Sequence, residues 1–250
     1  MTGTLSRPFV VDSAGERYLC FTYASVQSCM RVDDPYELVL AYTRKMMAFL
    51  LFLPKPRHVL MIGLGGGSLA KFCHRHLPQT RISVVEISAD VIALRERFWI
   101  PPDDERFEII HDDGAAYLAR VPLNVDVILV DAFDESGVAP LLASPDFYRQ
   151  ASRSLTADGV LVVNLSGQKI RYAIHVQGLC DAFDGTVVLV PVQDDDNVLL
   201  FAFRRPPLEA PQMLHDRATE LEEALGLDFH RLLQCLRMGP TLRQSTDCSR

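Results

Sequence analysis

Three acidic residues stand where apolar runs of the sequence end, and their placement points to a ligand site. Glu86, Asp113 and Asp131 each come at or just after the end of a short run that predicts a buried strand. In open α/β sheets, ligands bind outside the carboxyl ends of the strands. Carboxylates there can hold the hydroxyl or amino groups of a ligand, or accept a proton. Asp113 can instead cap a helix that begins at Gly114.

A glycine turn precedes the first of these acids. The apolar run Val59–Ile62 is broken by Gly63, Gly65, Gly66 and Gly67, and a helical segment, Ser68–His76, follows. Glycines let the backbone approach a ligand closely and leave the N–H groups of the helix start facing it. An acid about 20 residues past such glycines commonly binds the ribose hydroxyls of an adenosine group, and Glu86 stands in that place.

Three kinds of ligand compete for this turn. A phosphate-binding Walker loop is excluded because Gly67 is followed by Ser68-Leu69 and not by lysine. A dinucleotide site remains open, although Ser68 occupies the place of the last glycine in G-x-G-x-x-G. A nucleoside cofactor of the S-adenosylmethionine type fits best, because it also uses the acids at the neighbouring strand ends.

The elements that must position these residues alternate along the chain. We expect an α/β fold with a mostly parallel seven-stranded sheet covered by helices on both faces. The last two strands, near 186–192 and 198–203, leave no room for a crossover helix and should pair antiparallel. Helices are expected at 89–98, 115–119, 146–155, 169–183 and 214–236, the last interrupted near Gly226.

The segment before the glycine turn predicts a smaller unit. Short strands at 9–12, 17–23 and 26–32 should form an antiparallel β unit. We expect Asp34 to cap a helix with Pro35 at its first position, running to about Phe52. The predicted organisation is an N-terminal β unit at 1–35, a Rossmann-like catalytic domain at 36–205, and a C-terminal helix and tail at 206–250. The polar end from Gly239 is expected to lie outside the folded part.

Composition excludes several classes of protein. The net charge of −7 argues against a nucleic-acid surface and suits a cationic substrate. The six cysteines form no CxxC pair and indicate thiols in a reducing cytosol. No signal-peptide segment or membrane span is predicted, so we expect a cytoplasmic protein. We expect no metal, because Cys73-His74-Arg75-His76 does not present its ligands on one helix face.

At these residues the chain resembles the spermidine synthase (polyamine aminopropyltransferase) family, from about Gln27 to Phe203. The similar segments are VLMIGLGGGSL, VVEIS, HDDGAAYL and VDAFDESG. The resemblance implies a class I methyltransferase-like fold with a β-stranded N-terminal unit. It assigns Glu86 and Gln27 to the nucleoside cofactor, Asp113 to the adenine amino group, Asp131 to catalysis, and Asp134 to catalysis and the substrate amine.

The chain departs from the family pattern in the part that recognises amines. The family's glycine motif, G-G-G-D-G-G, carries an acid that holds the amine of decarboxylated S-adenosylmethionine, and the aligned residue here is Gly66. The family's Y-H-E is here most like Tyr42-Thr43-Arg44, which keeps Tyr42 as a substrate-binding candidate. Ala132, Phe133 and Glu135 replace two serines and a proline of the family's D-S-S-D-P segment.

The resemblance implies that an aminopropyl group moves from decarboxylated S-adenosylmethionine to an amine or polyamine, with methylthioadenosine as the second product. Because Gly66 replaces an acid, a methyltransferase that uses intact S-adenosylmethionine is the alternative. A non-catalytic nucleoside-binding module is a second alternative. The resemblance also implies a homo-oligomer, such as a dimer.

Overall fold

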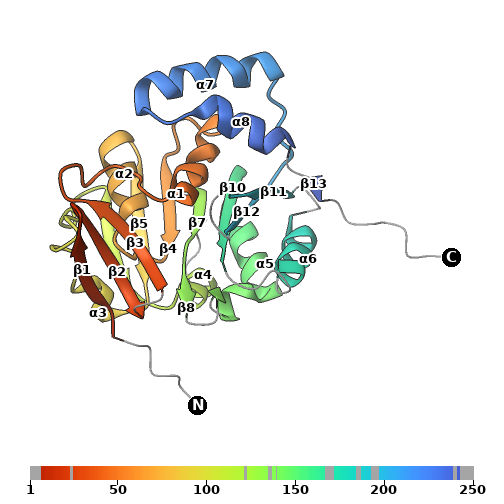
Figure 1. The fold of residues 1–250 in the computed structure, drawn as a ribbon. Coiled ribbons are helices and arrows are strands. Elements are labelled where there is room, and N and C mark those ends of the chain that lie inside the picture. Colours follow the sequence, from red (N-terminus) through yellow and green to blue (C-terminus); the bar gives the residue numbers. More distant parts are fainter. Residues whose placement is uncertain are drawn as a thin grey trace.

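The computed structural model describes residues 7–22, 25–120, 123–134, 137–138, 140–166, 172–183, 187–192, 197–238 and 241–242. Three antiparallel strands form a small sheet in the order β1-β2-β3, seen in red and orange at one side of the molecule in Figure 1. They are β1 (Phe9–Ser13), β2 (Glu16–Thr22) and β3 (Ser25–Arg31). The predicted N-terminal β unit is therefore present.

A second, larger sheet carries the rest of the chain, in the order β13-β11-β12-β10-β7-β4-β5-β6. The five strands from β10 to β6 run parallel, and β11, β12 and β13 add antiparallel pairs. The strands are β4 (His58–Ile62), β5 (Arg81–Glu86), β6 (Phe107–His111), β7 (Val125–Val130), β10 (Leu155–Leu165), β11 (Val187–Pro191), β12 (Val198–Phe203) and β13 (Thr241–Leu242). All seven predicted strands form this mostly parallel sheet. The expectation that the chain lies outside the fold from Gly239 is wrong at β13, which pairs with β11 and extends the sheet at one edge.

Helices cover both faces of the large sheet. They are α1 (Ala41–Met46), η1 (Met47–Leu51), α2 (Ser68–His76), α3 (Ala89–Ile92), α4 (Gly114–Arg120), η2 (Pro140–Ala143), α5 (Pro145–Ser154), α6 (Tyr172–Ala182), α7 (Pro211–Leu225) and α8 (Phe229–Met238). A two-stranded ribbon, β8 (Phe133–Asp134) with β9 (Gly137–Val138), follows β7. Figure 1 shows α7 and α8 together at the top, above α1.

The alternation of side chains along each strand explains the two helical layers. On β7, Val127 and Leu129 belong to a core cluster with residues of α1, α2, α7 and α8. Ile128 and Val130 belong to a second cluster with residues of α4, α5 and α6. Because neighbouring side chains of a strand point to opposite faces, an unbroken apolar run is needed for burial on both faces. Each fully buried aliphatic side chain contributes about 1.5–3 kcal/mol.

The β unit shares the first of these clusters. Leu19 of β2 and Met30 of β3 are both about 1% exposed and pack in the same cluster as the helices around η1. The small sheet is thereby held against the large one by apolar packing, which fixes the residues that β3 presents to the space between them.

The predicted helix from Asp34 to Phe52 is wrong in its first part. Residues 34–40 form a turn and an irregular segment, and α1 begins only at Ala41. Asp34 accepts a hydrogen bond from the Tyr36 N–H at 3.3 Å, so it stabilises a turn and does not cap the helix. The Arg44 guanidinium binds the carbonyls of Leu38 and Val39 at 2.5 and 2.6 Å, which holds the segment in its non-helical form.

Two other predicted elements differ in length. The helix expected over 89–98 is α-helical only over Ala89–Ile92, and it continues in turns to a Trp99 with φ of 56°. The C-terminal helix is two helices, α7 and α8, separated at Gly226 as predicted, where φ is 67°. None of the helices that the structure describes is both long and apolar enough to cross a membrane.

Candidate active site

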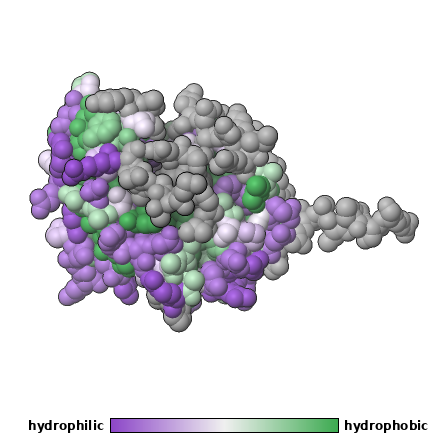
Figure 2. Space-filling model, turned by 90° about the horizontal axis from the view of Figure 1, so that it is seen from below, coloured by the Kyte–Doolittle hydropathy of each residue, from purple (hydrophilic) through white to green (hydrophobic). Residues whose placement is uncertain are grey.

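A cavity of about 270 Å³ lies at the carboxyl ends of β4, β5, β6 and β7, between the large sheet and the β unit. The arrow of β4 points downward in Figure 1, so Figure 2 looks at the end of the molecule where these strands finish. Hydrophilic residues border this face in Figure 2, and apolar residues are visible toward its middle. The cavity lies where the strand-end acids predicted a ligand site.

The glycine turn supplies one wall of the cavity. Gly63 has a φ of 98°, and a Cβ built on it would lie 2.2 Å from the backbone oxygen of Asp131. A glycine at this position therefore allows the end of β4 to approach the end of β7, where the Asp131 N–H donates to the carbonyl of Ile62 at 2.9 Å. This contact places the catalytic candidate beside the turn.

The four glycines do not share one role. Gly63 and Gly65 line the cavity. Gly66 and Gly67 are buried behind it, where an added Cβ on Gly66 would lie 2.6 Å from the Ser28 Oγ. An added Cβ on Gly67 would lie 2.5 Å from Ile100. The cofactor role of these two glycines stays a prediction, and their close packing explains why no larger residue stands there.

Glu86 is held rigidly at the end of β5. One of its carboxylate oxygens accepts the Leu64 N–H at 2.8 Å and the other accepts the Ser88 N–H at 2.8 Å. Burial raises the pKa of Glu86, and these backbone donors oppose that rise. Each oxygen keeps a further lone pair, and Glu86 lines the cavity. The carboxylate is thus oriented to accept hydrogen bonds from ligand hydroxyls.

Asp113 performs the helix-capping role and also lines the cavity. Its Oδ1 accepts the Ala116 N–H at 2.8 Å at the start of α4. The side chain nevertheless belongs to the cavity wall, next to Gly114. A cap uses one lone pair of a carboxylate, so capping and ligand binding are compatible.

Asp131 stands at the end of β7 between two polar side chains. The Tyr42 hydroxyl of α1 donates to one carboxylate oxygen at 3.0 Å, and the Asn164 amide of β10 donates to the other at 2.9 Å. Desolvation raises the pKa of Asp131 to about 6, and these two hydrogen bonds oppose the rise. The carboxylate is therefore mostly ionised at neutral pH and is basic enough to accept a proton.

Asn164 is a functional candidate that sequence reasoning missed. Its side chain is about 1% exposed, and its Oδ1 has no hydrogen-bond partner among the described residues. A buried acceptor without a partner is costly unless a ligand or water satisfies it. The signal in the sequence was one polar residue inside the apolar run Val160–Leu165, where a buried strand rarely places an amide.

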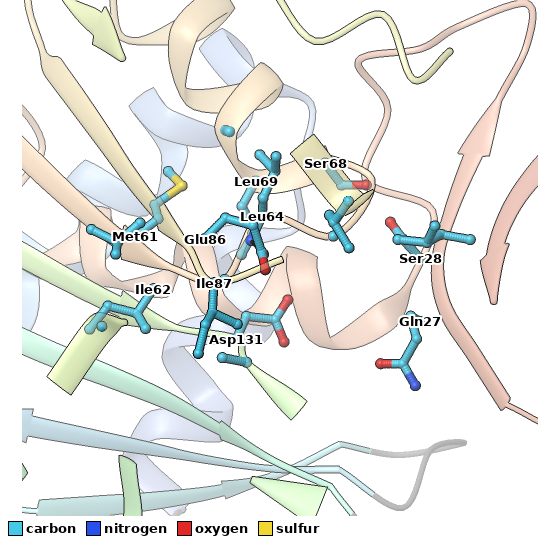
Figure 3. A pocket seen from close by; sticks show the side chains of 18 of the residues that line it. Gln27, Ser28, Met61, Ile62, Leu64, Ser68, Leu69, Glu86, Ile87 and Asp131 are labelled. Atoms are coloured by element: carbon cyan, nitrogen blue, oxygen red, sulfur yellow. Dashed lines mark hydrogen bonds between the residues drawn. The ribbon is translucent and has the colours of Figure 1, made fainter. Parts of the chain in front are cut away.

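The β unit supplies the wall opposite Asp131. Gln27 and Ser28 of β3 line the cavity together with Leu19 and Phe21 of β2. Figure 3 shows Gln27 and Ser28 on one side of the pocket and Asp131, Glu86 and Ile87 across from them. Gln27 was predicted to bind the cofactor, and the structure brings it to the same cavity as Glu86 and Asp131. Sequence reasoning gave Ser28 no role.

The second catalytic candidate is not tested by the structure. The backbone of Asp134 ends the short strand β8 and pairs with Gly137 of β9. Its side chain lies outside the described part, as do Glu135 and Ser136. The predicted role of Asp134 in catalysis and in amine binding therefore remains a prediction.

The described lining of the cavity carries only negative formal charges. Its ionisable carboxylates are Glu86, Asp113 and Asp131, and it includes no lysine or arginine. Among the described residues no group of three or more His, Cys, Asp or Glu side chains is arranged to hold a metal ion. His74 of the Cys73–His76 segment pairs with Asp104 at 2.9 Å.

Comparison with known proteins agrees with the family resemblance of the sequence. Residues 39–177 match the model of the spermine/spermidine synthase domain. The chain is 43% identical over 217 residues to a polyamine aminopropyltransferase of Neisseria meningitidis serogroup A, covering 85% of this chain and 82% of the relative. A polyamine aminopropyltransferase of Chromobacterium violaceum is 40% identical over 216 residues, with 85% of this chain and 82% of the relative covered.

Solved structures share the fold. A probable spermidine synthase from Corynebacterium glutamicum superposes with a TM-score of 0.72 at 16% identity, over 97% of this chain and 95% of its own. Human methyltransferase-like protein 13 in complex with SAH superposes with a TM-score of 0.67 at 25% identity, over 75% of this chain and 93% of its own. The predicted methyltransferase-like α/β fold is confirmed.

Proposed function

The chain belongs to the spermine/spermidine synthase family, and on this premise we propose that it transfers an aminopropyl group from decarboxylated S-adenosylmethionine to a small amine acceptor. The observation that carries the proposal is Asp131, held between Tyr42 and Asn164 at 3.0 and 2.9 Å beside the glycine turn. The acidic lining of the cavity suits both the cationic donor and a cationic polyamine.

In this reaction the acceptor nitrogen attacks the carbon next to the donor's sulfonium. A C–N bond forms, the C–S bond breaks with its electron pair going to sulfur, and neutral methylthioadenosine leaves. The leaving group needs no proton, but the nucleophile must lose one. Asp131 is the proposed base, and general-base catalysis of this kind contributes about 10²–10⁴-fold.

The other residues of the cavity then position the two substrates. Glu86 accepts from the ribose hydroxyls, Asp113 from the adenine amino group, and Gln27 contacts the donor from the β unit. Asn164 does not line the cavity, but its amide orients the Asp131 carboxylate through the hydrogen bond at 2.9 Å. Alignment of the nitrogen with the reacting carbon supplies much of the remaining acceleration.

The direct test is a turnover assay with a panel of diamines and polyamines, supplied with either decarboxylated or intact S-adenosylmethionine. We expect methylthioadenosine to form with the decarboxylated donor. Adenosylhomocysteine from the intact donor, with no methylthioadenosine from the other, would instead establish methyl transfer. Methyl transfer is the second candidate function because residue 66 is a glycine and not an acid. A Cβ added to Gly66 would lie 2.6 Å from the Ser28 Oγ.

The Tyr42 hydroxyl gives a pH-dependent prediction. Because its hydrogen bond favours the ionised form of Asp131, Tyr42→Phe should raise the pKa of Asp131 above its value of about 6. The acidic limb of the kcat/KM profile should move to higher pH, and turnover at neutral pH should fall about two- to tenfold. Measurement of initial rates from pH 5 to 9 checks this.

Tyr148→Phe is the matched control. Tyr148 is also buried, and its hydroxyl contacts His175 Nδ1 at 2.5 Å, outside the cavity lining. The control should leave the acidic limb in place. An acidic limb that does not move in Tyr42→Phe would contradict the assignment of Asp131 as the titrating base.

A further inference from the structure

The end of the cavity that receives the donor's tail differs from the rest in charge. The three carboxylates of the cavity lie at strand ends. Glu86 is the last residue of β5, Asp113 lies just after β6, and Asp131 lies just after β7. With adenine at Asp113, ribose at Glu86 and the sulfonium near Asp131, the tail beyond sulfur must run over the glycine turn toward β3. This placement rests on the proposed function.

The described residues at that end are neutral. The cavity is lined there by Gly65, Ser68 and Leu69 from the turn and α2, and by Gln27 and Ser28 from β3. Ser68 donates weakly to the Cys29 carbonyl at 3.5 Å, which joins α2 to β3. The described lining includes no lysine or arginine, and the Glu86 carboxylate next to the turn is held by the Leu64 N–H at 2.8 Å.

Ser28 is the side chain that shapes this end. It is about 5% exposed, so it is almost fully buried, yet it lines the cavity. Its hydroxyl makes no hydrogen bond to another described residue, and its Oγ lies 2.6 Å from the position that a Cβ of Gly66 would take. The hydroxyl thus occupies the space next to the turn that a longer residue 66 would need, and it can either donate to or accept from a ligand.

We infer that Ser28 is the donor-selecting residue, and that its neutral hydroxyl lets intact S-adenosylmethionine bind where the decarboxylated donor binds. The two donors differ only by the carboxylate on the tail. A carboxylate at position 28 would strongly repel the carboxylate of the tail in this buried place, whereas the Ser28 hydroxyl can donate a hydrogen bond to it. The same hydroxyl can accept a hydrogen bond from the ammonium group of the tail, but it binds that group less tightly than a carboxylate in the wall would.

The test is calorimetric titration of the full chain with each donor and with methylthioadenosine, which lacks the amine-bearing tail. For the wild-type chain we expect the two donors to bind within about tenfold of each other. Ser28→Asp should shift the ratio of dissociation constants about tenfold or more toward the decarboxylated donor, because the new carboxylate repels the intact tail. Ser83→Ala, a buried serine of β5 outside the cavity lining, should leave the ratio unchanged.

Ser28→Ala keeps the inference testable if the aspartate variant does not fold. It should weaken the intact donor about three- to tenfold and leave methylthioadenosine binding unchanged. A wild-type preference of more than about a hundredfold for the decarboxylated donor would overturn the inference. So would a ratio that neither Ser28 variant alters. These outcomes require no turnover, so they are separate from a failure of the amine panel to yield product.

Discussion

Asp131→Asn is expected to lower turnover about 10²–10⁴-fold while donor binding and the melting temperature stay close to those of the wild type. Asparagine has nearly the same shape, but it cannot take the proton of the attacking amine. Because burial raises the pKa of Asp131 to about 6, the charge is unfavourable to the fold at neutral pH, and its removal should not destabilise the chain. Steady-state kinetics, titration calorimetry and thermal unfolding check the three parts.

Asp126→Asn is the matched control on the same strand. Asp126 is buried at the opposite end of β7, where it accepts the N–H groups of Arg57 and His58 at 2.6 and 3.2 Å. Its change should lower stability more than turnover. Full activity in Asp131→Asn would exclude Asp131 as the base and would favour the non-catalytic binding module.

Gly63→Ala is expected to destabilise the chain by roughly 2–5 kcal/mol, from the strain of a positive φ and from overpacking. The φ of Gly63 is 98°, and the new Cβ would lie 2.2 Å from the backbone oxygen of Asp131. Relief requires the ends of β4 and β7 to separate, so any folded fraction should also lose activity. Urea unfolding followed by circular dichroism gives the free energy of unfolding.

Gly226→Ala is the control that separates the strain of a positive φ from overpacking. Gly226 also has a positive φ, 67°, but a Cβ there meets nothing within 4 Å. It should cost only about 1–2 kcal/mol, the part due to the positive φ. If Gly63→Ala loses no more stability than Gly226→Ala, the close contact between the glycine turn and Asp131 is not a real constraint on this fold.

The sheet and much of the site followed from the sequence because their causes are local. An apolar run buried on both faces, a glycine turn and an acid at the strand end can each be recognised within a few residues. Glu86, Asp113 and Asp131 accordingly line one cavity together with Tyr42 and Gln27. Their individual binding roles are proposed from the family and from chemical argument.

The errors came from side-chain contacts that residue types and spacing do not reveal. Asp34-Pro35 is a good helix start by its residue types, but Arg44 binds the carbonyls of Leu38 and Val39 and the helix begins later. Ser28 and Asn164 carry no motif, and they become candidates only because β3 lines the cavity and β10 pairs with β7. Neither juxtaposition can be derived from residue spacing.

The small sheet of β1, β2 and β3 has a consequence for how such proteins diversify. It faces Asp131, the proposed base, with Gln27 and Ser28, yet it contributes no strand to the sheet that holds Asp131. Exchange of this three-stranded β unit between homologues can therefore alter which substrate binds without changing the strands that hold Asp131. Laboratory recombination libraries built from residues 7–31 should yield altered selectivity at a higher frequency than libraries that vary the large sheet.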